Sequence, residues 1–138
     1  MVPTDTNLAL VKRLYDAFAE TDIIELLTAL HDDIEWVMPG PPEILPFAGT
    51  WKGRESVGRL LAVLAGTLVF ELFEPRRFLA DGDTVVVTGH SRDRMLATGR
   101  IVEIDWVAII EVRDGKVVRY QVYEDTAAFV AALEPIPA

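Results

Sequence analysis

The sequence predicts an α+β domain in which helices cover the concave face of a curved antiparallel sheet. Three observations support this prediction. Helical hydrophobic periodicity dominates the first half of the chain, long alternating segments follow it, and short turn motifs separate those segments. Long strands twist and curl, so we expect the sheet and helices to enclose a cone-shaped pocket. The 138 residues suffice for one domain with a substantial core, spanning 1–138.

The clearest strand pair spans residues 100–125. Even-numbered positions from Val102 to Val112 are apolar, whereas several odd-numbered positions between them are charged. Such alternation is typical of an antiparallel strand with one buried and one exposed face. The Asp114-Gly115 pair marks the hairpin turn. We therefore expect the even positions to face the core.

The remaining elements follow from apolar spacing and from turn residues. The predicted elements are helices at 7–20 and 22–30, a short strand at 34–38, a helix at 54–65, strands at 67–79 and 84–96, and a final helix at 126–134. Asp22 and Glu25 resemble a capping box, and Asp125 is in position to cap the last helix. Residues 39–52 show no regular period and are predicted to form a loop.

Composition excludes several classes of function. The chain has 22 acidic against 13 basic residues and no basic run, which disfavours nucleic acid and anionic membranes as partners. It has no cysteine, which excludes disulfides, thiolate catalysis and sulfur-bound metals. No secretion signal is recognisable at the N-terminus, and no apolar run is long enough to span a bilayer. We therefore expect a cytoplasmic protein.

The strand registers predict a polar cluster on the inner face. Three-residue loops at both hairpins would place His90, Arg92 and Glu124 there, beside Ile104 and Trp106. A change of one residue in either loop would move side chains to the outer face. A titrating histidine, a carboxylate and an arginine can together perform general acid–base chemistry. The alternative interpretation is a structural Arg92–Glu124 pair with a histidine packed on Trp106.

Aromatic and apolar side chains are expected to line the pocket and bind an apolar ligand. The candidate ligand-binding residues are Tyr15, Phe18, Trp36, Met38, Phe47, Trp51, Ile104, Trp106, Tyr120 and Val122. The alternative is that these side chains form only the core.

Other chemistries are not supported. The sequence has neither a glycine-rich phosphate loop nor a dinucleotide-binding fingerprint, so we expect no cofactor. The two histidines, His31 and His90, lie on different predicted elements, so we expect no metal site. Residues 89–93 begin like a nucleophile elbow, but their strand context excludes that motif.

Several motifs together resemble those of the SnoaL-like polyketide cyclase group. They are Asp22 after the first helix, Asp32-Asp33-Ile34-Glu35-Trp36, Gly49-Thr50-Trp51-Lys52-Gly53-Arg54, Asp81-Gly82-Asp83 and Val112-Arg113-Asp114-Gly115-Lys116-Val117. This group is part of the nuclear transport factor 2 superfamily, which includes ketosteroid isomerases and limonene epoxide hydrolases. The resemblance covers nearly the whole chain. It implies a curved sheet around a cone-shaped pocket and, usually, a homodimer.

The catalytic sets of two enzymes in this superfamily are absent. The two aspartates of ketosteroid isomerases correspond to Met38 and to a position near Ala108. The Arg-x-Asp motif and the last-strand aspartate of limonene epoxide hydrolases correspond to His90, Arg92 and Val122. Neither activity is therefore transferred to this chain, because a shared fold does not determine the reaction.

We expect an enzyme that uses general acid–base chemistry on a small, mostly apolar substrate, in a cyclisation, isomerisation or ring opening. In this interpretation His90 is the proton shuttle, Glu124 its partner and Arg92 the anion stabiliser. The alternative is a non-catalytic domain that binds an apolar ligand or a protein partner. Asp105 lies on the outer face in this register, whereas Glu71 can face either way.

The outer face of the sheet is predicted to be too apolar for a surface left open to water. Its apolar members in this register are Val85, Val87, Val107, Ile109 and Tyr123. We therefore expect a homodimer that forms through this face.

Overall fold

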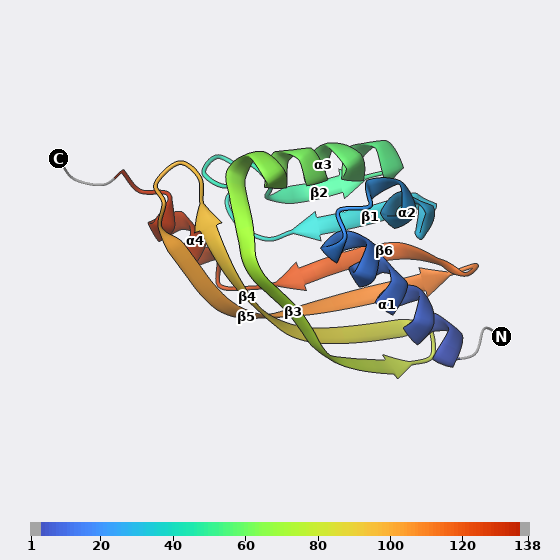
Figure 1. The fold of residues 1–138 in the computed structure, drawn as a ribbon. Helices are drawn as coiled ribbons and strands as arrows, with labels where there is room; N and C mark the ends of the chain where they lie inside the picture. Colours follow the sequence, from blue (N-terminus) through green and yellow to red (C-terminus); the bar gives the residue numbers. More distant parts are fainter. Residues whose placement is uncertain (1–3, 136–138) are drawn as a thin grey trace.

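The computed structural model describes residues 4–135, which Figure 1 shows as a ribbon. Met1 to Pro3 lie outside the described residues, so the N-terminal sequence used above is covered only in part. The helices are α1 (Thr4–Ala19), α2 (Ile23–Thr28), α3 (Arg54–Thr67) and α4 (Thr126–Ala132). The strands are β1 (Leu30–Met38), β2 (Gly49–Lys52), β3 (Leu68–Asp81), β4 (Thr84–Met95), β5 (Ile101–Arg113) and β6 (Lys116–Tyr123). Within 4–135, no helix has the length and apolar character needed to cross a membrane.

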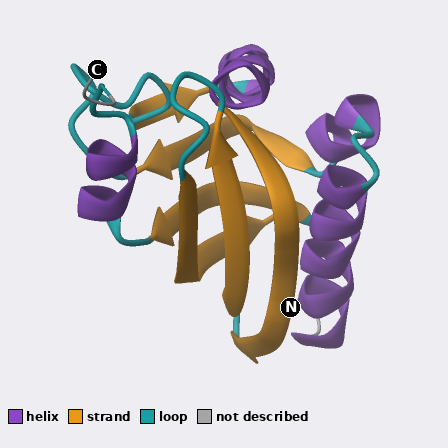
Figure 2. Cartoon of the chain, turned by 60° about the vertical axis from the view of Figure 1, so that its left-hand side comes forward, coloured by secondary structure: helices purple, strands orange, loops and turns teal. Residues whose placement is uncertain are grey.

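The strands form one six-stranded sheet in the order β2-β1-β6-β5-β4-β3. Neighbouring strands are antiparallel except for β1 and β6, which run parallel. Figures 1 and 2 show that this sheet is strongly curved and that the helices are arranged around it. The predicted α+β fold is therefore confirmed, with a mostly antiparallel sheet.

Segment 39–52 contains a strand that the sequence analysis does not predict. In β2, Trp51 lies opposite Trp36 of β1, and Gly49 lies opposite Met38. The strand has only four residues, so its periodicity cannot be distinguished from that of a loop. The prediction of a loop throughout this segment was therefore wrong at its C-terminal end.

Two helices begin at the caps that the sequence predicts. The Asp22 side chain accepts a hydrogen bond from the backbone N–H of Glu25 (3.1 Å), and Asp125 accepts one from Ala128 (3.1 Å). Each carboxylate satisfies one of the N–H groups left free in a first helical turn. Because α4 begins so soon after β6, Glu124 lies between the last strand and the last helix.

The face assignment of β5 is confirmed. Its residues alternate between buried and exposed along the whole strand, with every even position from Val102 to Val112 buried. The Trp106 side chain is only 3% exposed, whereas Asp105 lies on the exposed face. The regular alternation in the sequence therefore identifies the core-facing side of the central strand.

The loop between β4 and β5 differs from the predicted one. It has four residues, 96–99, and is closed by a hydrogen bond from Met95 N to Arg100 O (2.8 Å). Thr98 Oγ1 holds this loop by accepting from the Arg100 N–H (3.2 Å) and donating to the carbonyl of Ala132 in α4 (2.6 Å). The extra residue shifts β4 by one position relative to the prediction, which exchanges its inner and outer faces.

The β5–β6 hairpin also differs, but Glu124 stays on the predicted face. Asp114 and Gly115 both have positive φ angles (54° and 72°) and form a two-residue turn instead of a three-residue loop. A register shift beside Glu111 then moves the pairing by a further residue. Together the two changes amount to two residues, which preserves the inner and outer faces of β6.

Candidate active site

A cavity lies between the inner face of the sheet and the helices. Of the predicted ligand-binding residues, those that line it are Tyr15, Phe18, Trp36, Met38, Phe47, Trp106, Tyr120 and Val122. Ile104 is buried in the core without lining the cavity. Trp51 also lies outside the lining, and its indole N–H donates to the carbonyl oxygen of Phe47 (2.9 Å). The wall of the cavity is therefore largely aromatic.

The aromatic rings form a continuous arc across the cavity wall. Trp36 stacks on Tyr120, with 3.9 Å between ring centroids, and the Tyr120 hydroxyl lies 2.8 Å from that of Tyr15. Tyr15 stacks on Trp106 at 5.7 Å, and Trp106 stacks on Phe73 at 5.1 Å. Such stacked arrangements are favourable beyond the area they bury. The arc therefore gives the cavity a continuous apolar surface.

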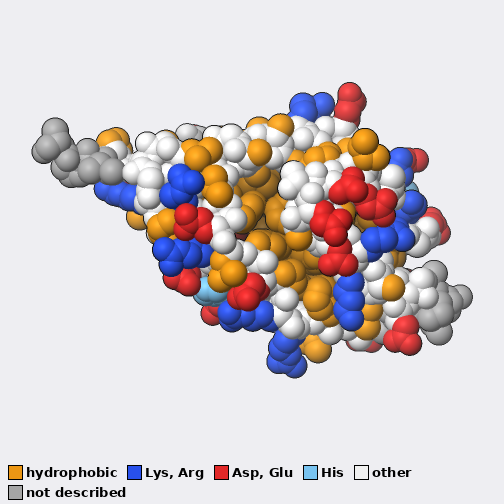
Figure 3. Space-filling view, viewed as in Figure 1, with side chains coloured by type: hydrophobic (Ala, Val, Ile, Leu, Met, Phe, Trp, Pro, Cys, Tyr) orange, Lys and Arg blue, Asp and Glu red, His pale blue; other side chains and the backbone are white. Residues whose placement is uncertain are grey.

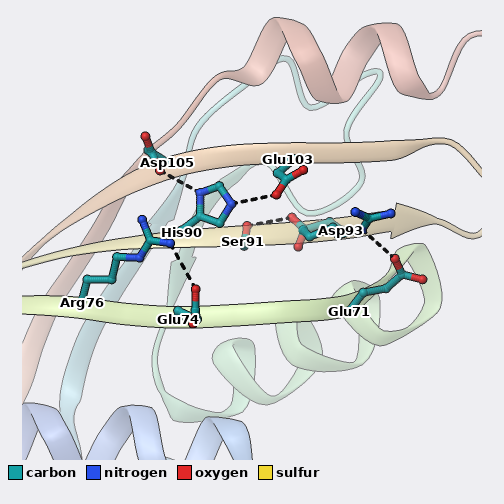
Figure 4. Close-up of polar contacts among 9 residues, drawn as sticks. Glu71, Glu74, Arg76, His90, Ser91, Asp93, Glu103 and Asp105 are labelled. Atoms are coloured by element: carbon teal, nitrogen blue, oxygen red, sulfur yellow. Dashed lines mark hydrogen bonds and ion pairs between the residues drawn. The ribbon is translucent and has the colours of Figure 1, made fainter.

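Two polar residues of β4 face this apolar cavity. Ser91 and Asp93 are almost completely buried, and Asp93 is only 1% exposed. The Ser91 hydroxyl donates to Asp93 Oδ2 (3.3 Å), as Figure 4 shows. Asp93 Oδ1 has no hydrogen-bond partner within the described part of the chain. A buried carboxyl oxygen without a partner is costly to the fold, which is typical of a functional group.

Glu124 lines the same cavity from the other side of β5. Burial raises the pKa of Glu124 to about 7, and the nearby Asp93 charge acts in the same direction. Burial likewise raises the pKa of Asp93 to about 7, against the opposing effects of the Ser91 hydrogen bond and the His90 charge. Two carboxyl groups in one cavity are therefore both able to gain and lose protons near neutral pH.

The aromatic arc also supplies hydrogen-bond donors. The indole nitrogens of Trp36 and Trp106 are buried and have no acceptor among residues 4–135. Burial raises the pKa of the Tyr15 hydroxyl, and it raises the pKa of the Tyr120 hydroxyl as well. Both hydroxyls therefore remain protonated, and because one donates to the other, one proton of the pair is left for a ligand. The cavity thus offers donors to an oxygen atom of a bound molecule.

Comparison with known proteins identifies the family. The model of the SnoaL-like domain matches residues 11–120. The chain belongs to the SnoaL-like family. It is 30% identical over 129 residues to the uncharacterized protein Rv0034 of Mycobacterium tuberculosis, an alignment that covers 90% of this chain and 93% of that protein.

Two solved structures are similar to this SnoaL-like chain over nearly their whole length. A nuclear transport factor 2-like protein from Burkholderia xenovorans is 34% identical, with a TM-score of 0.88, covering 97% of this chain and 100% of the other. TerC, whose crystals contained polyporic acid, is 31% identical, with a TM-score of 0.84, covering 94% of this chain and 99% of the other. These similarities confirm the resemblance found in the sequence.

The SnoaL-like chain does not bring His90 and Arg92 together with Glu124. His90 pairs with Asp105 across the β4–β5 ladder, whereas Gly89 takes the position opposite Trp106. Both predicted catalytic side chains of β4 therefore point to the outer face, and the prediction that they share the cavity with Glu124 was wrong. The four-residue loop at 96–99 causes this error.

On the outer face, His90 and Arg92 form ion pairs with carboxylates. The His90 ring lies 2.8 Å from Asp105 Oδ1 and 3.0 Å from Glu103 Oε1, as Figure 4 shows. The hydrogen bond with Asp105, and then that with Glu103, raises the pKa of His90. Arg92 donates to Glu71 Oε1 (3.2 Å), which places Glu71 on the outer face as well. The predicted outer position of Asp105 is confirmed.

Sequence reasoning missed Ser91 and Asp93 as site residues. One signal was available in β4 itself. Its odd positions from Val85 to Met95 carry apolar or short side chains, whereas its even positions include His90, Arg92 and Arg94. That alternation places the odd positions inside. The prediction relied instead on a register that assumed a three-residue loop before β5, and that register placed the even positions inside.

Gly89 is the third inner-face residue that matters for the site. A Cβ atom at this position would overlap the ring of Trp106 and lie 2.7 Å from the carbonyl oxygen of Glu74. The absence of a side chain in glycine therefore allows the indole to lie directly on the backbone of β4. This contact fixes the position of the Trp106 ring within the aromatic arc.

Proposed function

We propose that this SnoaL-like chain is an enzyme that transfers protons on a small, mostly apolar molecule, with Asp93 and Glu124 as its acid–base pair. The supporting observation is that both carboxyl groups face one apolar cavity in which burial keeps them partly protonated at neutral pH. A group is most effective in acid–base catalysis when its pKa lies close to the working pH. Enzymes carry out acid–base chemistry with pairs of carboxyl groups of which one is protonated while the other is charged.

Repulsion between the two carboxylates favours a state in which one is charged and the other holds a proton. The charged group removes a proton from the carbon next to a substrate carbonyl. The protonated group then delivers its proton to another atom of the resulting enolate, which gives an isomerisation. If the enolate instead attacks a second carbonyl of the same molecule, a carbon–carbon bond forms and the proton goes to the new alkoxide, which gives a cyclisation.

The unpaired donors of the aromatic arc would bind the substrate oxygen during these steps. The indole N–H groups of Trp36 and Trp106 and the Tyr15–Tyr120 hydroxyl pair all border the same cavity. Donors that are already in place stabilise the negative charge that develops on an enolate oxygen. The relative TerC was co-crystallised with polyporic acid, which supports an oxygen-bearing organic molecule as the kind of ligand for this cavity.

Proton exchange on simple ketones tests the proposal without knowledge of the substrate. Wild-type protein is incubated with a panel of apolar aryl and alkyl ketones in deuterated water, and deuterium incorporation beside the carbonyl is followed by NMR. We expect exchange above the buffer rate for part of the panel, and a loss of about 10²-fold or more in Asp93→Asn and in Glu124→Gln. His90→Gln is the matched control and retains the wild-type rate.

Exchange that is equal in wild type and both carboxyl variants would contradict the proposal. Ketone binding without any exchange would instead favour the alternative, a non-catalytic domain that holds an apolar ligand in the same cavity.

We also propose that the chain is a homodimer formed through the outer face of the sheet. Of the five apolar side chains expected there, three are exposed, with Val107 and Ile109 both 36% exposed and Tyr123 48% exposed. Val85 and Val87, which were expected on this face, are buried because the register of β4 differs from the prediction. An apolar stretch on the face opposite the helices is typical of an interaction surface.

A further inference from the structure

A second hollow lies beside the cavity, between the end of α1, one side of α3 and the start of β3. We call it the outer groove. Figure 3 shows a hollow lined by apolar side chains in this region, open to the solvent. The groove has a volume of about 670 Å³, whereas the free volume of the inner cavity is about 70 Å³. The larger space is thus outside the carboxyl-bearing cavity and next to it.

These volumes limit what can bind. Small-molecule sites usually occupy about 300–1,000 Å³. The inner cavity, at about 70 Å³, lies well below this range, whereas the groove, at about 670 Å³, lies within it. The inner cavity alone is therefore too small for a whole ligand of this kind, and the groove has room for the rest of a small molecule.

Three phenylalanines separate the two spaces. Phe18, Phe70 and Phe73 line both the cavity and the groove, together with two leucines, Leu64 and Leu68. The three rings contact one another, with centroid distances of 5.4, 5.0 and 5.3 Å. We call these rings the aromatic partition.

The strand geometry explains why both β3 rings belong to the aromatic partition. Phe70 and Phe73 are three residues apart, so a regular strand would direct them to opposite faces. A β-bulge between Phe70 and Leu72 inserts one extra residue, Glu71, and returns Phe73 to the inner face. All three partition rings are only half-buried, which leaves them freer to rotate than the fully buried side chains of the core.

We propose that the ligand of the inner cavity is elongated and occupies both spaces, its oxygen-bearing end beside Asp93 and Glu124 and its apolar remainder in the outer groove. This inference rests on the proposed function, because it assumes that the carboxyl-bearing cavity receives the reacting end. The aromatic partition rotates aside to let the ligand pass. The described residues that line the groove are all uncharged, so the part of the ligand lying there is uncharged and apolar.

Straight-chain methyl ketones of increasing length provide the test, with dissociation constants measured by calorimetry. In wild type we expect affinity to rise by about fourfold for each CH₂ group that becomes buried, until the groove is filled. Ala62→Trp fills the groove from an exposed position on α3 without reaching the inner cavity. In this variant we expect affinity to stop rising at a shorter ketone, and the longest ketone to bind on the order of tenfold more weakly than it does to wild type.

The matched control is Ala127→Trp, at an exposed alanine of α4 that lines neither space. It should give the wild-type dependence on chain length, and the shortest ketones should bind equally to all three proteins. A series in which no member binds more tightly than the shortest overturns the proposal. An equal dependence of affinity on chain length in wild type and Ala62→Trp overturns it as well. So does an Ala62→Trp variant whose sedimentation changes while its ketone affinities do not.

Failure of this inference can be distinguished from failure of the proposed function. Asp93→Asn removes the proposed chemistry but leaves the groove intact, so it should preserve the dependence of affinity on chain length. If that dependence holds while deuterium exchange is unaffected by Asp93→Asn, the groove assignment stands and the catalytic proposal fails.

Discussion

The two faces of β4 place consecutive residues in opposite environments. On the inner face, Ser91 and Asp93 are closed off from water, and burial raises the pKa of Asp93 to about 7. On the outer face, His90 lies between two carboxylates that raise its pKa, and Arg92 pairs with Glu71 at the surface. Histidine is the residue type that normally titrates near neutrality. Here burial gives Asp93 a pKa in that range, so the environment of this residue decides where it titrates more than its chemical type does.

The comparison also shows where the fold loses stability. A buried carboxyl group with a raised pKa disfavours the folded state whenever the group is ionised. Ion pairs at an exposed surface contribute little in either direction. The inner face should therefore respond strongly to pH and to substitution, and the outer face weakly.

The largest expected effect is a gain in stability on Asp93→Asn. The folded pKa of Asp93 is about 7 against an ordinary value of 3.8, so between about pH 4 and pH 7 the unfolded chain binds fewer protons than the folded one. The free energy of unfolding therefore falls as pH rises through this window and levels off above it. An amide at this position does not titrate, so we expect the variant to gain at most about 4 kcal/mol at pH 8 and to change little near pH 4. Denaturant unfolding at several pH values measures it.

His90→Gln is the control from the opposite face, and it should retain the fall in stability between about pH 4 and pH 7. The account would be contradicted if Asp93→Asn left that dependence unchanged or lowered stability at pH 8.

A smaller effect is expected at Gly89, where the inner face is closely packed. Gly89→Ala introduces a Cβ that overlaps Trp106, and such overpacking typically costs about 1–3 kcal/mol. Gly66→Ala in α3 is the matched control, because beyond its chain neighbours and the backbone of its own helix the added Cβ meets no atom within 4 Å. That substitution should stabilise the helix by about 0.5–1 kcal/mol. Similar unfolding free energies for the two variants would show that the indole does not rest on β4.

Substitution of apolar residues on the outer face should affect assembly and leave proton transfer in the cavity unchanged. We expect a dimer in sedimentation experiments, with about 1,200–2,000 Å² buried in total. Ile109→Arg places a charge in the exposed apolar stretch and should weaken dimerisation at least about tenfold, or about 1.4 kcal/mol. Asp93→Asn should not change it. A monomeric wild type at micromolar concentration would contradict the proposed interface.

The smallest effect concerns the His90 pKa, followed by NMR titration of the ring. Asp105→Asn should lower it most, and Glu103→Gln should lower it less, because the Asp105 hydrogen bond is the larger cause of the shift. Glu124→Gln should leave it unchanged, since Glu124 faces the cavity on the other side of the sheet. A clear shift on Glu124→Gln would mean that the Glu124 charge acts on His90 through the sheet, which contradicts the assignment of the two residues to opposite faces.

The sequence predicts the fold well because fold depends on patterns within single elements. The alternation of β5, the caps at Asp22 and Asp125, and the family motifs each depend on a few neighbouring residues. The site depends on how two strands align. That alignment is set by the loop at 96–99, and Thr98 fixes the loop through a hydrogen bond to α4, more than thirty residues away. A contact of that range leaves no local signal, so the inner face of β4 was assigned incorrectly.

Glu124 was placed on the cavity side correctly, but for a less secure reason. The predicted β5–β6 loop was one residue too long, and the register shift beside Glu111 was not predicted. Together the two errors amount to two residues, so β6 keeps its predicted inner face. The pKa of about 7 at Glu124 could not be predicted, because it comes from burial beneath helices and from Asp93, whose position was unknown.

Direct titration of the two inner carboxyl groups tests the central claim most closely. Carbon-13 NMR of the side-chain carboxyls of Asp93 and Glu124 follows both as pH is raised, with Asp93→Asn and Glu124→Gln for assignment. We predict that the pair titrates with apparent pKa values near 7, and that each single variant lowers the value of the group that remains. Values below about 5 for both carboxyls, close to those of exposed acids, would contradict the account.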